Sequence, residues 1–427
     1  MKIQQFEVSG LHGNEESITL NFHDDLNILS GRNGAGKTTI LKLMWYLVSG
    51  NFDKAAAEIT FESAMLKTDK YELNVRINFQ DKDRPFSSKL QVKDVNTLKI
   101  KGIDNDENFK KILNNKSKTD IAWFITQYID SSFFMPTFRM IEGGFTTEKY
   151  DIKHDVTKEF YLNLNKENDY NEIDNALKKL SKNLTKKDHI FITSISAKDI
   201  DDFLVKKYAE IMKKVNQNQR ESLNFLGKKV SMMLKQESDS EIFITLDKKI
   251  DDLEIETKLL NEPLKKIKMA VAEFIPIFRI EFDEKIYFSK VEMEDLNEVI
   301  QEENEESYYL GDQTYDIDLD VAPKLDELEL EDLDFDNKLK LTINNLSAGE
   351  KQLLTFVAYN IFNNDTIFFI DEPELSLHVD WQNKLFSLLK EQNPSNQFII
   401  STHSPFIYSL FPDKELVIDS DKGCSEF

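Results

Sequence analysis

Apolar-rich stretches separated by polar residues predict strands in the first quarter of the chain. Three short stretches, Ile3–Val8, Ile18–Phe22 and Leu26–Leu29, are each typical of a strand. Residues 57–103 alternate apolar and polar side chains repeatedly, as in Tyr71–Phe79, and this pattern predicts an antiparallel sheet. The chain is therefore expected to begin with strands.

Longer-period patterns follow and predict helices in the middle of the chain. Residues 104–130 and most of 155–272 mix apolar and charged residues as helices do, and a strand-like stretch interrupts them at 190–193. Lysines in 155–272 are matched by acidic residues, which is typical of a solvated helical face. Because no apolar heptad persists there, we expect a compact helical lobe and not a long coiled coil. Four consecutive apolar residues, as in a strand buried on both faces, occur at 367–370, and another apolar strand is expected at 397–400.

Composition limits the class of protein. The 427 residues are enough for two or three structural units. The only cysteine, Cys424, excludes a disulfide framework or a cysteine-based zinc site and fits a reducing cytosol. No apolar run approaches the length of a membrane span, and the first residues lack the apolar centre of a signal peptide. We therefore expect a cytoplasmic protein without a membrane segment.

The acidity of the chain is concentrated in one segment. The net charge is −23, but residues 281–336 hold 22 Asp and Glu against three Lys, which leaves only −4 for the remainder. The total charge therefore does not exclude a basic surface elsewhere. Residues 292–336 are either a solvated loop or a strip that repels DNA or holds a basic partner.

A glycine-rich motif lies between the strand ending at Leu29 and the apolar run that follows Thr38. Residues 31–38 read GRNGAGKT, the G-x-x-x-x-G-K-T pattern that binds nucleotide phosphates when a strand precedes it and a helix follows. Backbone N–H groups would hold the phosphates, Lys37 would contact the β- and γ-phosphates, and Thr38 would bind magnesium. The candidate nucleotide-binding residues here are Asn33, Gly34, Ala35, Gly36, Lys37, Thr38 and Thr39.

Three further motifs lie near the C-terminus. Ser347, Gly349 and Glu350 belong to a small-residue turn before an apolar helix, which predicts either an anion site or an ordinary helix cap. Asp371 and Glu372 follow the buried strand at 367–370, where open α/β sheets place ligands; the alternative is an acidic loop without a site.

His403 follows the apolar strand at 397–400. A lone histidine is usually structural, but its position one strand after the acidic pair favours a functional role.

Together these motifs resemble the ABC-type ATPases. The order of phosphate loop, Ser-x-Gly-Glu, Asp-Glu and histidine is that of the family, and Asp371–His378 (DEPELSLH) is similar to its RecF/Rad50-like branch, the AAA_15 and AAA_21 groups. Within that branch the chain most resembles the ATPase subunits of two-gene anti-phage systems, PARIS-type first and Septu-type second. The segments 136–139 and 142–144 are also similar to elements of these ATPases.

The resemblance implies an α/β fold. It comprises an ABC-type ATPase head, with a parallel core sheet and an antiparallel β subdomain, and an inserted, mainly helical lobe. The expected parts are residues 1–150 and 337–427 for the head, 151–280 for the lobe, and 281–336 for the acidic segment.

The resemblance also implies the chemistry of the site. ATP and Mg²⁺ would be the ligands, Asp371 a magnesium ligand, Glu372 the general base and His403 the γ-phosphate sensor. Gln127 is our hypothesis for the glutamine that also binds the metal in this family. Ser347 and Gly349 would complete the site of a second subunit in a head-to-head homodimer.

The long stretch between the phosphate loop and the Ser-x-Gly-Glu motif indicates which members of the family the chain resembles. Lys37 and Ser347 are 310 positions apart, more than a transporter subunit needs, and no nuclease motif is present. The implied function is therefore an ATPase, in a homodimer or higher homo-oligomer, that controls a separate TOPRIM-like or HNH nuclease or a toxin in anti-phage defence, with a phage protein as trigger. The alternative is a RecF-like repair clamp that acts on DNA; whether DNA is bound stays open.

Overall fold

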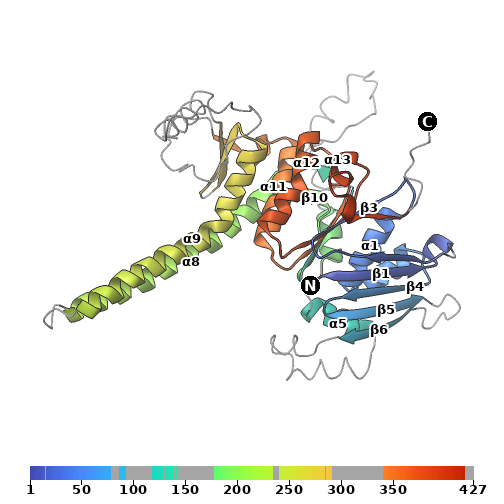
Figure 1. Cartoon of the computed structure of the whole chain (residues 1–427), viewed down its shortest axis with the longest axis horizontal. Helices are drawn as coiled ribbons and strands as arrows, with labels where there is room; N and C mark the ends of the chain where they lie inside the picture. The colour runs from blue at the N-terminus through green and yellow to red at the C-terminus, as the bar shows by residue number, and fades with distance from the viewer. Residues whose placement is uncertain are drawn as a thin grey trace, which may run out of the picture. The chain divides into compact units, whose positions relative to one another are not determined.

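The computed structural model forms two compact units. The first contains residues 1–196 and 363–427 and the second contains residues 197–362 (Figure 1). The first unit extends beyond the expected boundary at 150, because a strand near residue 190 joins its main sheet. The expected boundaries at 280 and 336 both fall inside the second unit. The structure describes residues 1–14, 16–77, 86–92, 118–128, 130–137, 140–141, 177–233, 240–283, 285–290 and 340–418.

The main sheet of the first unit has six strands in the order β16-β3-β15-β14-β7-β9, and every neighbouring pair is parallel. The central strands β3, β14 and β15 carry side chains that are buried along their whole length, as the four consecutive apolar residues at 367–370 predicted for β14. The strands are β3 (Leu26–Ser30), β7 (Ser132–Met135), β9 (His189–Phe191), β14 (Ile367–Asp371), β15 (Gln397–Ser401) and β16 (Glu415–Val417).

A second, antiparallel sheet in the same unit has the order β2-β1-β4-β5-β6. Its strands show the alternating burial that the sequence pattern predicted, for example throughout β4 and most of β5. The strands are β1 (Ile3–Ser9), β2 (Ile18–Asn21), β4 (Ser63–Thr68), β5 (Tyr71–Ile77) and β6 (Phe86–Val92).

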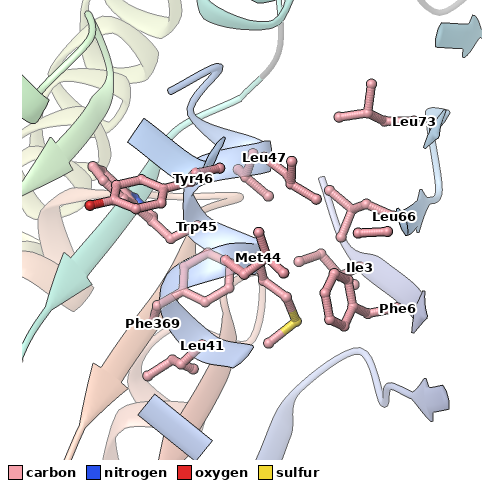
Figure 2. Close-up of a cluster of buried hydrophobic side chains, with 14 of the residues drawn as sticks. Ile3, Phe6, Leu41, Met44, Trp45, Tyr46, Leu47, Leu66, Leu73 and Phe369 are labelled. Atoms are coloured by element: carbon pink, nitrogen blue, oxygen red, sulfur yellow. The ribbon is translucent and has the colours of Figure 1, made fainter. Parts of the chain in front are cut away.

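Helix α1 (Lys37–Val48) lies between the two sheets. In Figure 2 its side chains meet Phe369 of β14 on one side and Phe6, Leu66 and Leu73 of the antiparallel sheet on the other. Every residue from Leu43 to Val48 is buried, because a helix that is apolar on all faces has to be enclosed. This packing fixes the position of the phosphate loop, which ends where α1 begins.

The remaining elements of the first unit are short. Helix α5 lies within the predicted helical stretch 104–130, and α12 connects β14 to β15. These elements are η1 (Leu11–Gly13), α2 (Phe52–Glu58), α5 (Lys118–Tyr128), β8 (Met140–Ile141), β10 (Ser194–Ile195), α12 (Val379–Gln392), α13 (Pro405–Tyr408) and η5 (Pro412–Lys414).

The second unit corrects the expectation of a compact helical lobe. Helices α8 (Ala197–Met233) and α9 (Ser240–Phe274) are 37 and 35 residues long and form an antiparallel hairpin (Figure 1). The seam side chains follow the 3–4 spacing of a coiled coil. They are Leu204, Tyr208, Ile211, Val215, Asn218, Ser222 and Phe225 on α8 and Leu253, Thr257, Leu260, Leu264, Ile267, Val271 and Phe274 on α9.

The hairpin was missed because polar residues occupy seam positions. Ser222 is only 3 % exposed, and the Asn218 side-chain amide donates to Glu256 Oε2 at 3.1 Å. A search for apolar residues alone therefore finds no persistent heptad on α8. The hairpin leads into a small antiparallel sheet, β11-β12-β13, and then into α11.

These last elements of the second unit carry the Ser-x-Gly-Glu motif. They are β11 (Phe278–Phe282), β12 (Ile286–Lys290), β13 (Lys340–Thr342), η4 (Ile343–Asn345) and α11 (Ala348–Phe362).

The α/β fold class is confirmed: a parallel sheet, an antiparallel sheet and helices are all present. None of the helices in the described ranges has the length and hydropathy needed to cross a bilayer. Several predictions concern residues outside those ranges, among them Arg139, the segment 142–144, Cys424 and most of the acidic segment 281–336. They stay predictions.

Candidate functional site

The candidate site lies at one edge of the parallel sheet, where four neighbouring strands end. Asp371, the last residue of β14, pairs with Ser401 of β15, and Ser401 pairs with Leu29 of β3. On the other side, Ile370 pairs with Met135 at the end of β7. Since all four strands are parallel, their following loops emerge together, at the edge where open α/β sheets bind ligands.

The phosphate loop follows β3 and needs glycine at two positions in particular. Gly34 and Gly36 have φ angles of 86° and 90°, a backbone conformation that residues other than glycine rarely adopt. Gly36 caps α1, whose N-terminal N–H groups and dipole favour an anion. Asn33 and Gly34 are exposed, so the loop is open to a ligand.

Lys37 lies directly behind this loop. Its side chain is 5 % exposed, and its Nζ donates to the carbonyl oxygens of Gly31 at 2.9 Å and Arg32 at 3.1 Å. Burial lowers the pKa of Lys37, while the carboxylates of Asp371, Glu372 and Glu374 oppose this effect. A cation is thus held against the loop within reach of three acidic groups.

Thr38 and Asp371 contact each other across the site. Thr38 Oγ1 donates to Asp371 at 3.1 Å from Oδ1 and 3.0 Å from Oδ2. Thr137, in the loop after β7, also donates to Asp371 Oδ2. The Asp371 carboxylate is fully buried, so two hydroxyl groups fix its orientation.

Oxygen ligands of this kind suit magnesium. A hydroxyl from the first turn of α1 and a carboxylate from the end of β14, beside a phosphate-binding loop, match the small number of protein ligands that Mg²⁺ uses together with phosphate oxygens. Thr38 and Asp371 would hold the ion, with Thr137 orienting the carboxylate. The residues therefore fit the predicted metal.

Glu372 has an unusual backbone conformation. Its φ is 48°, which is uncommon for a residue other than glycine, and its N–H donates to Ser401 O at 2.8 Å. Such conformations tend to be found at functional sites. The carboxylate is half-buried and lies beside Asp371 in the sequence, at the ligand-facing edge of the sheet.

His403 lies in the loop after β15. Burial and the nearby Lys37 lower its pKa, while Glu374 and Asp371 oppose this effect. The neutral imidazole is therefore favoured near pH 7. Its backbone N–H donates to Glu374 Oε1 at 2.9 Å.

The Ser-x-Gly-Glu motif lies in the second unit, at the start of α11. Ser347 N donates to Glu350 Oε2 at 2.5 Å, and Glu350 N donates to Ser347 Oγ at 3.3 Å. This reciprocal pair is a capping box. Ser347 is exposed, whereas Gly349 is buried.

Several residues near the site were absent from the sequence-based set. Thr137 and Glu374 contact its members directly, and His12 Nε2 lies 3.3 Å from Thr39 Oγ1. Thr137 follows a strand and belongs to the segment 136–139 that resembles elements of anti-phage ATPases, but neither signal pointed to a contact with Asp371. Gln127 lies on α5, but its side chain is outside the described part of the chain, so its role stays a prediction.

Comparison with known sequences gives a family match over nearly the whole chain. Residues 1–408 match the AAA ATPase domain family AAA_15. The Retron Vc95 probable ATPase of Vibrio cholerae serotype O1 biovar El Tor is 34 % identical over 95 residues, 19 % of this chain and 18 % of that protein. The Septu protein PtuA of Bacillus thuringiensis is 31 % identical over 91 residues, 19 % and 22 % of the two chains.

Two other proteins are also similar. The DNA replication and repair protein RecF of Clostridium acetobutylicum is 29 % identical over 99 residues, 21 % of this chain and 26 % of that one. A crystal structure of the Smc head domain of Pyrococcus furiosus superposes with a TM-score of 0.40 at 11 % identity, over 96 % and 91 % of the two chains. Each of the three sequence matches thus spans about a quarter or less of the relative's length.

Proposed function

The chain belongs to the AAA_15 family of AAA ATPase domains, and from this premise we propose that it binds ATP with Mg²⁺ and hydrolyses it to ADP and phosphate at the edge of the parallel sheet. The observation that carries this proposal is the contact between Thr38 and Asp371. It brings a hydroxyl from the phosphate loop and a carboxylate from another strand to one point, beside Lys37. A nucleotide with a divalent cation needs this combination.

Each residue has a role in the proposed reaction. The loop N–H groups from Asn33 to Thr39 hold the phosphates, and Lys37 moves from the carbonyls of Gly31 and Arg32 to the β- and γ-phosphates. Glu372 accepts a proton from the attacking water. His403 donates a hydrogen bond to the γ-phosphate. Bound magnesium, held by Thr38 and Asp371, supplies charge neutralisation for the phosphate oxygens.

We further propose that two chains form head-to-head composite sites. Ser347 is exposed at the N-terminal end of a 15-residue helix, a position that can donate to a phosphate from outside. Exposed apolar side chains flank the catalytic loops: Leu375 and Val379 follow Glu372, and Phe406 follows His403. A second subunit would cover these side chains.

The ATPase cycle would control a separate effector, a nuclease or toxin in anti-phage defence. The similarity to a retron ATPase and to a Septu protein supports this assignment. The similarity to RecF favours the alternative, an ATP-dependent clamp on DNA. A nuclease or toxin gene next to this one is expected from the first function, and a position among replication genes from the second.

Glu372→Gln tests the reaction. Loss of a general base reduces the rate by about 10²–10⁴, so kcat should fall by that factor while the Kd for ATP changes by less than about threefold. Glu391→Gln, an exposed glutamate on α12, is the matched control and should keep the parent rate. Hydrolysis by Glu372→Gln at the parent rate would show that another group is the base.

The same variant separates the two functions. Glu372→Gln loaded with ATP should be trapped in its ATP-bound state. A clamp would then retain duplex DNA in the presence of ATP and release it in its absence. ATP-independent or absent DNA binding, measured by fluorescence anisotropy, would argue against the clamp.

A further inference from the structure

Glu374 accepts three hydrogen bonds at one carboxylate oxygen. Its Oε1 accepts from Thr402 Oγ1 at 2.7 Å, from His403 N at 2.9 Å and from Ser404 N at 3.1 Å. All three donors belong to the loop after β15, whereas Glu374 belongs to the loop after β14. One side chain thus binds three consecutive residues of another loop, with the histidine in the middle.

Further hydrogen bonds connect the same two loops, in one case through Gln382 of α12. Ser404 Oγ donates to Gln382 Oε1 at 2.6 Å, and Gln382 Nε2 donates to Leu377 O at 2.9 Å. At the base of the loops, Glu372 N donates to Ser401 O at 2.8 Å. Glu374 lies between these two connections in the sequence, and its side chain accepts from the backbone N–H of His403.

The chemistry of this contact favours a fixed loop. Hydrogen bonds to a carboxylate are shorter and stronger than those between neutral groups. Two of the donors are backbone N–H groups in a loop, where no strand partner is available to them. Removing the carboxylate leaves His403 N without its acceptor, whereas Ser404 N keeps Thr402 Oγ1 at 2.9 Å. The loop then has to change conformation or admit water at His403.

We propose that Glu374 is a positioning residue that holds the His403 loop against the nucleotide and joins it to the loop of Glu372. This inference rests on the proposed ATPase function. Glu374 acts through His403: it fixes the backbone from which the imidazole reaches the γ-phosphate. The positions of Glu372, the proposed base, and of His403 are thereby fixed relative to each other.

A double-mutant cycle on the full chain tests the proposal. Glu374→Ala should lower kcat roughly 10- to 100-fold, the range found when residues that orient a site's primary ligands are removed, with KM for ATP changed by less than about threefold. Glu374→Gln keeps a carbonyl oxygen for the same donors and should recover most of the rate. In a His403→Ala background, adding Glu374→Ala should lower kcat by less than about a further threefold. The effects of two residues that act together are not additive.

The possible outcomes are distinct. Additive losses in the cycle, or failure of Glu374→Gln to recover more than Glu374→Ala, would mean that Glu374 only supports the fold, and would overturn the proposal. An unchanged kcat in Glu374→Ala would do the same. If the parent hydrolyses ATP and Glu372→Gln does not, the proposed function stands whatever Glu374 does. A parent without ATPase activity would overturn both.

Discussion

His189 should make the stability of the first unit depend on pH. His189 begins β9 and is fully buried, and its Nδ1 lies 2.8 Å from Oγ of Ser132 on the neighbouring strand β7. Burial is the largest cause that lowers the pKa of His189, to about 4 from 6.5, while the backbone of Ile125 and the carboxylate of Asp188 oppose it. The folded state therefore keeps this histidine neutral at pH values where the unfolded chain protonates it.

The sign and size of the effect follow from linkage. Between pH 6.5 and about 4 the unfolded state binds one more proton, so the free energy of unfolding falls as the pH falls. At 1.36 kcal/mol per pKa unit, the difference amounts to about 3 kcal/mol. This contribution is fully present above pH 6.5 and is lost at pH 4.

Tryptophan fluorescence during urea unfolding can measure this effect in one unit. All three tryptophans, Trp45, Trp123 and Trp381, lie in the first unit. Trp45 is 5.3 Å from the ring of Phe191, which is close to His189 in β9. The difference in unfolding free energy between the parent and His189→Asn, measured from pH 7.5 to pH 4, should shrink by about 3 kcal/mol.

Taking the difference between the unfolding free energies of the parent and the variant cancels the contribution of the carboxylates, because both proteins contain them. His23→Asn, at an exposed histidine in the same unit, is the control for replacing an imidazole outside the core. A pH-independent difference for His189→Asn would refute the reasoning, because a buried neutral histidine cannot leave the stability unaffected in this range.

The other predictions concern the nucleotide site. Thr137→Val removes a hydroxyl that orients Asp371, so the Mg²⁺ concentration for half-maximal ATPase activity should rise roughly tenfold or more. Thr126→Val, on α5, is the control. Equal Mg²⁺ concentrations for both variants would contradict the role of Thr137 in orienting Asp371. Ser347→Arg and Lys37→Ala subunits should each be inactive alone and regain one working site when mixed into heterodimers. Verified heterodimers without activity would contradict composite sites.

Contiguous motifs could be predicted from the sequence, because their geometry is local. The strand, glycine loop and helix around Lys37 are adjacent in the chain, and the structure has all three where they were expected. Asp371 was predicted for the same reason: it ends an uninterrupted apolar strand. In such cases the spacing of residues along the chain already determines which groups are near each other.

Contacts that depend on strand order could not be predicted in this way. Thr137 and Asp371 are 234 positions apart and meet because β7 and β14 are parallel neighbours. Glu374 was part of a recognised motif, but its contacts with residues 402–404 depend on the return of β15 beside β14. The hairpin of α8 and α9 was missed for another reason, since Asn218 and Ser222 at its seam hide the heptad from a search for apolar residues.

The burial of α1 limits where movement during an ATPase cycle can take place. A helix packed against two sheets cannot rotate or slide without opening both interfaces, so its first turn and the phosphate loop form a stationary reference within the first unit. Within the first unit, displacements on binding of the proposed nucleotide are then expected in the segments that follow β14 and β15, at residues 372–378 and 402–410. Spectroscopic labels for following the cycle should be attached there, at exposed positions such as Ser376 or Leu410, measured against a second label on the antiparallel sheet.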